Sequence, residues 1–159
     1  MSSTSFTDRS GRKWELRCTL DTIRSVSVAH GVALNRIASD PAVMTALEDP
    51  VTVADVLATM LEAELQARSV SRSDFESSLD GNTLEAATES LLEAVAGFLP
   101  STQSKLLRGA LATMRSAKER ANAAAERALA SGAIDRAVAK QLANVEAEIA
   151  KLDPDNAPT

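Results

Sequence analysis

Residues 101–152 read STQSKLLRGALATMRSAKERANAAAERALASGAIDRAVAKQLANVEAEIAKL, and they contain two helical patterns joined at Ser131-Gly132. Apolar residues recur in both patterns at spacings of three and four, which is the repeat of one face of an α-helix. The first row is interrupted at Lys118 and consists of Leu107, Leu111, Met114, Ala121, Ala125 and Ala128. The second row consists of Ile134, Val138, Leu142, Val145, Ile149 and Leu152. We therefore predict two long amphipathic helices, 101–130 and 133–152.

Each apolar row must be buried against another surface, and two arrangements satisfy this. The second helix folds back on the first as an αα-hairpin, or both helices extend to reach a partner or a second copy of the chain. Ser131-Gly132 permits a reversal without requiring one. In the second arrangement, the partner-binding residues are Leu107, Leu111, Met114, Ile134, Val138, Leu142, Val145 and Ile149.

The chain length and composition favour one helical domain with an appendage. The chain has 159 residues, of which 45% are hydrophobic and only 3% aromatic, so its core must consist mainly of aliphatic side chains. No apolar run approaches the roughly 20 residues needed to span a bilayer. The N-terminus lacks the apolar region of a secretory signal, and we expect the protein to stay in the cytoplasm in which it is made.

Charge is unevenly distributed. Residues 41–99 carry two Lys/Arg and eleven Asp/Glu, a net charge of −9, whereas 1–40 and 100–159 each carry a net charge of +2. A nucleic-acid duplex requires a clustered basic face, so the acidic middle argues against nucleic acid as the main ligand. We interpret it as a solvated helical surface.

The N-terminal region shows the only strand signal. Ser5-Phe6-Thr7 precedes a turn sequence, Asp8-Arg9-Ser10-Gly11, after which apolar and polar residues alternate as far as Leu20. This pattern predicts a β-hairpin pairing about 5–8 with about 12–20. An isolated hairpin is marginally stable, so its apolar face should dock on helices or another chain. The predicted docking residues are Phe6, Trp14, Leu16 and Leu20.

Between the hairpin and the long helices, capping residues and prolines delimit a compact set of helices. Asp21, Asp40-Pro41 and Asp49-Pro50 are helix starts, and Gly31 is a helix end. The predicted helices span about 21–30, 41–47, 52–68 and 83–98, with a capping sequence at Ser71–Asp74. The expected organisation is a hairpin arm, a helical body, a long helical pair and a disordered tail, over residues 1–20, 21–100, 101–152 and 153–159.

The sequence contains no clear catalytic or metal site. His30 is the single histidine, and Cys18, on the apolar face of the predicted strand, resembles a small hydrophobic residue. Oxygen ligands gather between Asp74 and Glu85, but their spacing does not match a calcium-binding loop. We therefore predict a non-enzymatic protein without a metal or cofactor.

Four segments of the chain resemble the motifs of one protein family. They are Phe6-Thr7-Asp8-Arg9-Ser10-Gly11-Arg12-Lys13-Trp14, the helix around Val53-Ala-Asp-Val-Leu, Asp74-Phe75 and Leu84-Glu-Ala-Ala. Together they resemble the tail assembly chaperones of long-tailed phages and prophages. The resemblance covers about residues 5–130, and the extension after it has no counterpart in the family.

This resemblance implies a non-enzymatic chaperone in the cytoplasm of a bacterial host. Such proteins bind the long helical tape-measure protein, keep it soluble, recruit tail-tube subunits and tend to self-associate. One alternative is a structural tail or connector protein that remains in the virion. A third is a small helical regulator that binds nucleic acid.

Overall fold

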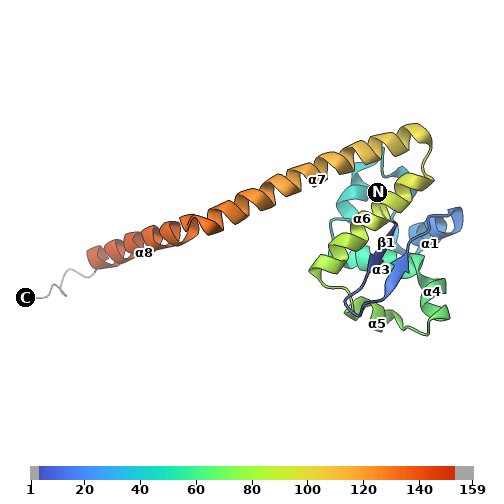
Figure 1. Cartoon of the computed structure of the whole chain (residues 1–159), viewed down its shortest axis with the longest axis horizontal. Helices are drawn as coiled ribbons and strands as arrows, with labels where there is room; N and C mark the ends of the chain where they lie inside the picture. Colours follow the sequence, from blue (N-terminus) through green and yellow to red (C-terminus); the bar gives the residue numbers. More distant parts are fainter. Residues whose placement is uncertain (1–3, 153–159) are drawn as a thin grey trace, which may run out of the picture. The chain divides into compact units, whose positions relative to one another are not determined.

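The computed structural model describes residues 4–152, except for the side chains at 133, 134, 150 and 152. The described chain forms one two-stranded sheet and eight α-helices (Figure 1). This confirms a mainly α fold with an N-terminal β-hairpin and long C-terminal helices. The chain divides into two units, the first ending at Leu111 and the second beginning at Ala112. The predicted disordered tail, 153–159, lies outside the described residues.

The N-terminal hairpin pairs β1 (Ser5–Thr7) with β2 (Lys13–Glu15) in antiparallel register, with Phe6 opposite Trp14. The predicted turn closes it. The Gly11 N–H donates to the Asp8 carbonyl at 2.9 Å, and the Asp8 N–H donates to the Arg12 carbonyl at 2.9 Å. Gly11 has a φ of +79°, a conformation that glycine adopts at little cost.

The second strand is shorter than the alternating pattern predicted, because a helix start competes with it. Thr19 and Thr22 form a reciprocal capping box, so α1 (Leu20–His30) begins where the strand was expected to end, and Thr19 is the cap instead of Asp21. The prediction for Leu20 is therefore wrong. Leu20 lies in the first turn of α1 with 70% of its surface exposed, whereas Phe6, Trp14 and Leu16 are buried.

Gly31 ends α1 in the left-handed conformation, with φ +69°, and its N–H donates to the Ser27 carbonyl. We expect Gly31→Ala to destabilise the chain by about 1 kcal/mol, because a Cβ is disfavoured at this φ. Gly109→Ala is the matched control. Gly109 lies inside a helix with open space around its Cα, so alanine there should stabilise by a few tenths to 1 kcal/mol. Urea unfolding measures the free energy of unfolding of both variants. Equal changes in the two variants would mean that the left-handed conformation of Gly31 does not disfavour alanine.

The middle of the chain follows the predicted caps. Asp40 and Asp49 cap α2 (Pro41–Ala46) and α3 (Pro50–Met60), each with proline in the first turn. The single predicted helix over 52–68 is wrong. It breaks at Leu61, and α4 (Glu62–Ala67) follows. Leu61 at the break and Leu65 after it are both buried. A 3₁₀ helix, η1 (Leu34–Arg36), links α1 to α2.

The core of the first unit lies between α1, α3, the hairpin and α6 (Gly81–Phe98), with α5 (Arg72–Ser77) supplying Phe75. The Phe75 ring meets the Trp14 ring edge-on with centroids 5.3 Å apart, and the guanidinium of Arg68 lies 4.7 Å from the Trp14 ring centroid. The largest fully buried side chains are Trp14, Phe75, Leu34, Leu57, Leu91, Val26, Val53, Val56 and Val95.

The first turns of α7 (Ser101–Ala130) belong to this core. Leu107 and Leu111 are 3% and 5% exposed, and the Nε of Arg108 lies 3.6 Å from a carboxylate oxygen of Glu93 on α6. The first unit therefore extends beyond residue 100 into the long helix. The last helix, α8 (Ala133–Leu152), belongs to the second unit.

Candidate functional site

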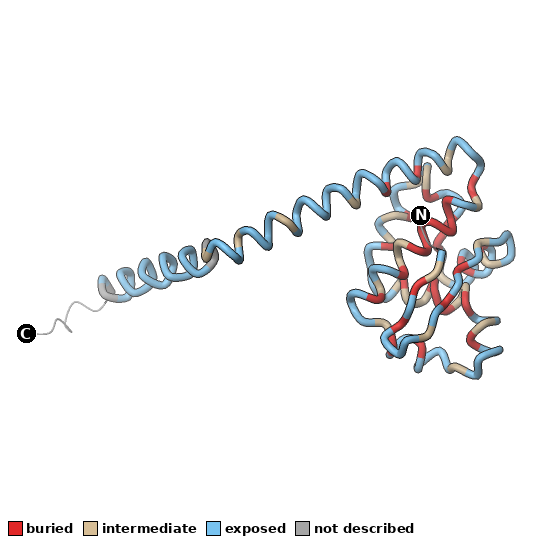
Figure 2. Tube along the Cα trace, in the orientation of Figure 1, coloured by how far each residue is buried: buried red, intermediate tan, exposed pale blue. Residues whose placement is uncertain are grey.

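The second unit has several large apolar side chains that are exposed. Every described side chain between 135 and 149 is exposed, whereas buried residues are concentrated in the first unit (Figure 2). The exposed fractions of the large apolar residues here are Met114 53%, Leu129 65%, Val138 51%, Leu142 59%, Val145 48% and Ile149 60%. We call these six residues the apolar face.

The predicted contact set must be corrected at its beginning. Leu107 and Leu111 lie in the chain's own core and are not available to a partner. Because α7 starts directly after α6, its first apolar turns pack on the core of the first unit. The ion pair between Arg108 and Glu93 adds to this contact. The row that is free to contact another polypeptide begins at Met114.

Of the two arrangements that the sequence left open for the long helices, the αα-hairpin is not formed by the described residues. If α8 packed on α7, Met114, Leu142 and Ile149 would be covered by the facing helix, but each keeps about half or more of its surface exposed. The side chain of Ile134 lies outside the described residues. Leu129 is exposed although it was not part of the predicted row; its spacing of four from Ala125 and eight from Ala121 places it beside that row.

The junction between the two helices is where Ser131-Gly132 predicted it. Gly132 has φ +63°, and its N–H donates to the Leu129 carbonyl at 3.2 Å. The Ser131 N–H donates to the Arg127 carbonyl at 2.9 Å. These bonds close α7, and α8 starts at the next residue.

The apolar residues of α8 fit a heptad pattern. Leu142 and Ile149 are seven residues apart and occupy equivalent a-type positions. Val138 and Val145 occupy d-type positions, four residues before and three residues after Leu142. Ala147 lies on the opposite side of the helix. Such a helix offers a narrow apolar stripe of the kind that packs against one other helix.

Cys18 packs against the core of the first unit, and His30 forms a hydrogen bond to another helix. Burial raises the pKa of the Cys18 thiol to about 11, which disfavours the nucleophilic thiolate at neutral pH. His30 Nε2 lies 2.8 Å from the hydroxyl of Thr59, a hydrogen bond that joins the end of α1 to α3.

The acidic residues considered for calcium also have local structural roles. Asp74 accepts a hydrogen bond from the Ser71 hydroxyl, Glu76 accepts one from Arg72, and Asp80 caps α6. Hydrogen bonds from Thr83 lower the pKa of Asp80, as expected for a capping carboxylate. Among the described residues, no group of three or more His, Cys, Asp or Glu is arranged to hold a metal ion.

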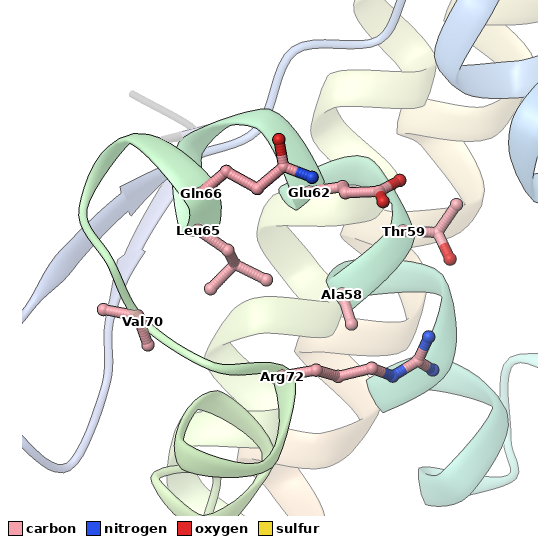
Figure 3. Close-up of a pocket in the computed structure, with 7 residues that line it drawn as sticks. All are labelled: Ala58, Thr59, Glu62, Leu65, Gln66, Val70 and Arg72. Carbon is pink, nitrogen blue, oxygen red and sulfur yellow. The ribbon is translucent and has the colours of Figure 1, made fainter.

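One hollow of about 240 Å³ lies beside the break between α3 and α4 (Figure 3). Its lining combines apolar groups with the charged side chains of Glu62 and Arg72. The Arg72 guanidinium is held by Asp55 and Glu76, so it anchors α5 to α3. The residues around the hollow are Ala58, Thr59, Glu62, Leu65, Gln66, Val70 and Arg72.

No α-helix within residues 4–152 is long and apolar enough to cross a membrane. Comparisons of the chain with protein-family models, with curated proteins and with solved structures gave no significant match. The apolar face of the second unit is therefore the feature from which a function is argued.

Proposed function

We propose that this chain is a non-enzymatic assembly chaperone that covers the apolar surface of a helical partner with its own apolar face. By its resemblance to tail assembly chaperones, the proposed partner is a tape-measure protein, onto which tail-tube subunits are then recruited. The proposed setting is the cytoplasm of a bacterial host.

The observation that carries the proposal is the contrast between the two predicted apolar rows. The first row begins with Leu107 and Leu111, which are buried in the core, whereas Val138, Leu142 and Ile149 of the second row are half exposed on a helix with no described buried side chain. A 20-residue helix is only marginally stable without packing on an apolar face. Contiguous exposed apolar side chains typically mark a protein-interaction surface. A partner helix would stabilise α8 and be shielded from aggregation at the same time.

Charge reversal of the apolar face tests the proposal. We expect Leu142→Glu combined with Ile149→Glu to weaken partner binding by a factor of about 30 or more, because two carboxylates would be buried without counter-charges. The readout is the amount of the tape-measure protein of the same genome that stays soluble on co-expression. Ala147→Glu with Ala143→Glu adds the same charges to α8 away from the stripe and should preserve solubilisation.

Both variants should keep the Trp14 fluorescence and the urea midpoint of the first unit, since none of these residues contributes to its core. If the Leu142→Glu, Ile149→Glu protein still solubilised the partner as well as wild type, the apolar face would not be the binding surface. The virion-retained alternative is tested separately by mass spectrometry of purified particles. A chaperone should be absent from them.

A further inference from the structure

We propose that the occupant of the α8 stripe is an amphipathic helix whose own apolar row is bordered on both sides by lysine or arginine. The α8 stripe consists of Val138, Leu142, Val145 and Ile149. The inference rests on the proposed function in that it concerns the partner of the same surface. It adds the charge that the partner must carry beside its apolar row.

The charged residues of α8 are separated by sign around the helix. The helix has three acidic and three basic residues, so its side-chain charges sum to zero. Successive side chains of an α-helix are about 100° apart, which places the four stripe residues within about 30° of a common direction. The acidic residues lie about 50–90° from that direction and the basic residues about 150–170° from it. The stripe is therefore bordered by Asp135, Glu146 and Glu148, whereas Arg136, Lys140 and Lys151 lie on the far side.

Glu146 and Glu148 border the stripe on its two opposite edges. Relative to the a-type and d-type positions of the stripe, they occupy the e and g positions, whose charges determine partner choice when helices pair. Both side chains are exposed, and neither forms an ion pair with another described residue. Glu148 has one basic residue within four positions, Lys151, and Glu146 has none. Their carboxylates are therefore available to cations on a partner.

This arrangement makes the stripe selective for charge. When another helix packs on the stripe, the residues beside its apolar row approach Glu146 and Glu148 on both edges. Lysine or arginine there would be attracted, whereas glutamate or aspartate there would be repelled. Attraction of one class of helix together with repulsion of the other is how paired helices obtain specificity.

The same arrangement argues against a membrane surface as the occupant. Helices that lie on anionic membranes combine an apolar face with a polar face rich in lysine and arginine. In α8 the charged groups nearest the stripe are carboxylates, so they would face the anionic headgroups if the stripe entered a lipid surface. A basic-bordered helix satisfies the stripe and its edges together.

Two synthetic peptides test the charge preference. Each is a helix of about 21 residues, or three heptads, with leucine at the a and d positions, and they differ only in carrying lysine or glutamate at the e and g positions. Fluorescence anisotropy of the labelled peptide, at nanomolar concentration, measures its binding to the full chain at up to about 300 μM. We expect the lysine peptide to bind about tenfold tighter at 0.1 M salt. The ratio should approach one at 1 M salt, because the Debye length falls from about 10 Å to about 3 Å.

Variants of the full chain locate the preference. Glu146→Lys combined with Glu148→Lys should reverse it, so that the glutamate peptide binds tighter. Lysine is favoured near a helix C-terminus, so this variant should keep its far-UV circular dichroism. Glu146→Gln and Ala147→Lys form a matched pair, since each makes the net charge of the chain one unit more positive. Glu146→Gln should reduce the preference about threefold, whereas Ala147→Lys, on the far side of α8, should preserve it.

Three outcomes would overturn the inference. The first is equal affinity for the two peptides at 0.1 M salt, or a preference that the Glu146→Lys, Glu148→Lys protein retains. The second is no binding of either peptide, as expected if a second copy of the chain fills the stripe. The third is binding to phosphatidylcholine–phosphatidylserine vesicles that Leu142→Glu abolishes, which would identify a membrane as the occupant.

These readouts need no tape-measure protein, so the two proposals can fail separately. A chain that solubilises the tape-measure protein but binds both peptides equally disproves the charge preference alone. A chain with the expected preference that does not solubilise the tape-measure protein disproves the chaperone function alone.

Discussion

Replacing Asp8 with alanine is expected to lower the free energy of unfolding of the first unit by about 3–5 kcal/mol. The Asp8 carboxylate is fully buried and accepts four hydrogen bonds. Their donors are the Arg12 N–H at 2.9 Å, Arg12 Nε at 2.8 Å, the Trp14 indole N–H at 2.9 Å and the Ser78 hydroxyl at 3.1 Å. Removing the carboxylate leaves the buried indole N–H of Trp14 and part of the Arg12 guanidinium without an acceptor, and such groups are costly away from water. The Ser78 hydroxyl keeps the Phe75 carbonyl as an acceptor at 2.6 Å.

The measurement is urea unfolding followed by Trp14 fluorescence. Trp14 is the chain's single tryptophan and is completely buried beside Asp8, so its emission reports on this unit alone. Asp21→Ala, which removes an exposed carboxylate from α1, should change stability by less than about 0.5 kcal/mol. If Asp8→Ala lowers the free energy of unfolding by less than about 1 kcal/mol, the hydrogen bonds to Asp8 contribute little to stability.

The same carboxylate predicts a pH dependence. Burial raises the pKa of Asp8, but the hydrogen bonds from Trp14, Arg12 and Ser78 lower it by more, so its pKa in the folded chain lies below the ordinary 3.8. The native state therefore binds this proton less readily than the unfolded chain. The stabilisation from Asp8 is present above about pH 4 and is lost as the pH falls through the lower, folded-state pKa. The stability gap between wild type and Asp8→Ala should accordingly narrow below pH 4.

The second large effect is expected from Leu111→Ala, which should destabilise the first unit by about 2–5 kcal/mol. Leu111 is 5% exposed and joins the cluster formed with α6, so its removal loses buried apolar contacts and leaves a cavity. Leu142→Ala deletes the same atoms from the same type of residue in the second apolar row. Leu142 is 59% exposed, so its replacement should change the stability of the first unit by less than about 0.5 kcal/mol.

This pair of variants also separates folding from partner binding. Leu111→Ala should shift the Trp14 unfolding midpoint, while Leu142→Ala should leave that midpoint unchanged and reduce solubilisation of the partner. Equal shifts from the two substitutions would mean that α8 packs on the first unit in solution.

Local signals predicted much of the fold. Asp40-Pro41, Asp49-Pro50 and Ser71 cap helices as expected, because a side-chain acceptor next to free backbone N–H groups acts within a few residues. Predictions failed where two local signals competed. The alternating pattern that ends at Leu20 predicted a strand, but the Thr19–Thr22 capping box starts a helix there. The continuous apolar pattern over 52–68 gave no sign of the break at Leu61.

The buried Asp8 network was not predicted as a unit. The turn sequence identified Asp8 as a turn residue, but its bond to Ser78 joins residues seventy positions apart in the chain. No spacing rule links residues so far apart, and only the packing of α5 on the hairpin brings them together.

The sequence by itself determined the positions of the turns, most helix ends and the phase of the apolar rows, because these depend on interactions between residues a few positions apart. Only the tertiary structure decided which part of each row is core and which is surface. Periodicity shows that Leu111 and Leu142 each lie on an apolar side of a helix, but whether that side is covered depends on where the rest of the chain packs. Leu111 is buried in the core of the first unit and Leu142 is exposed within the second, and the proposed function follows from that difference.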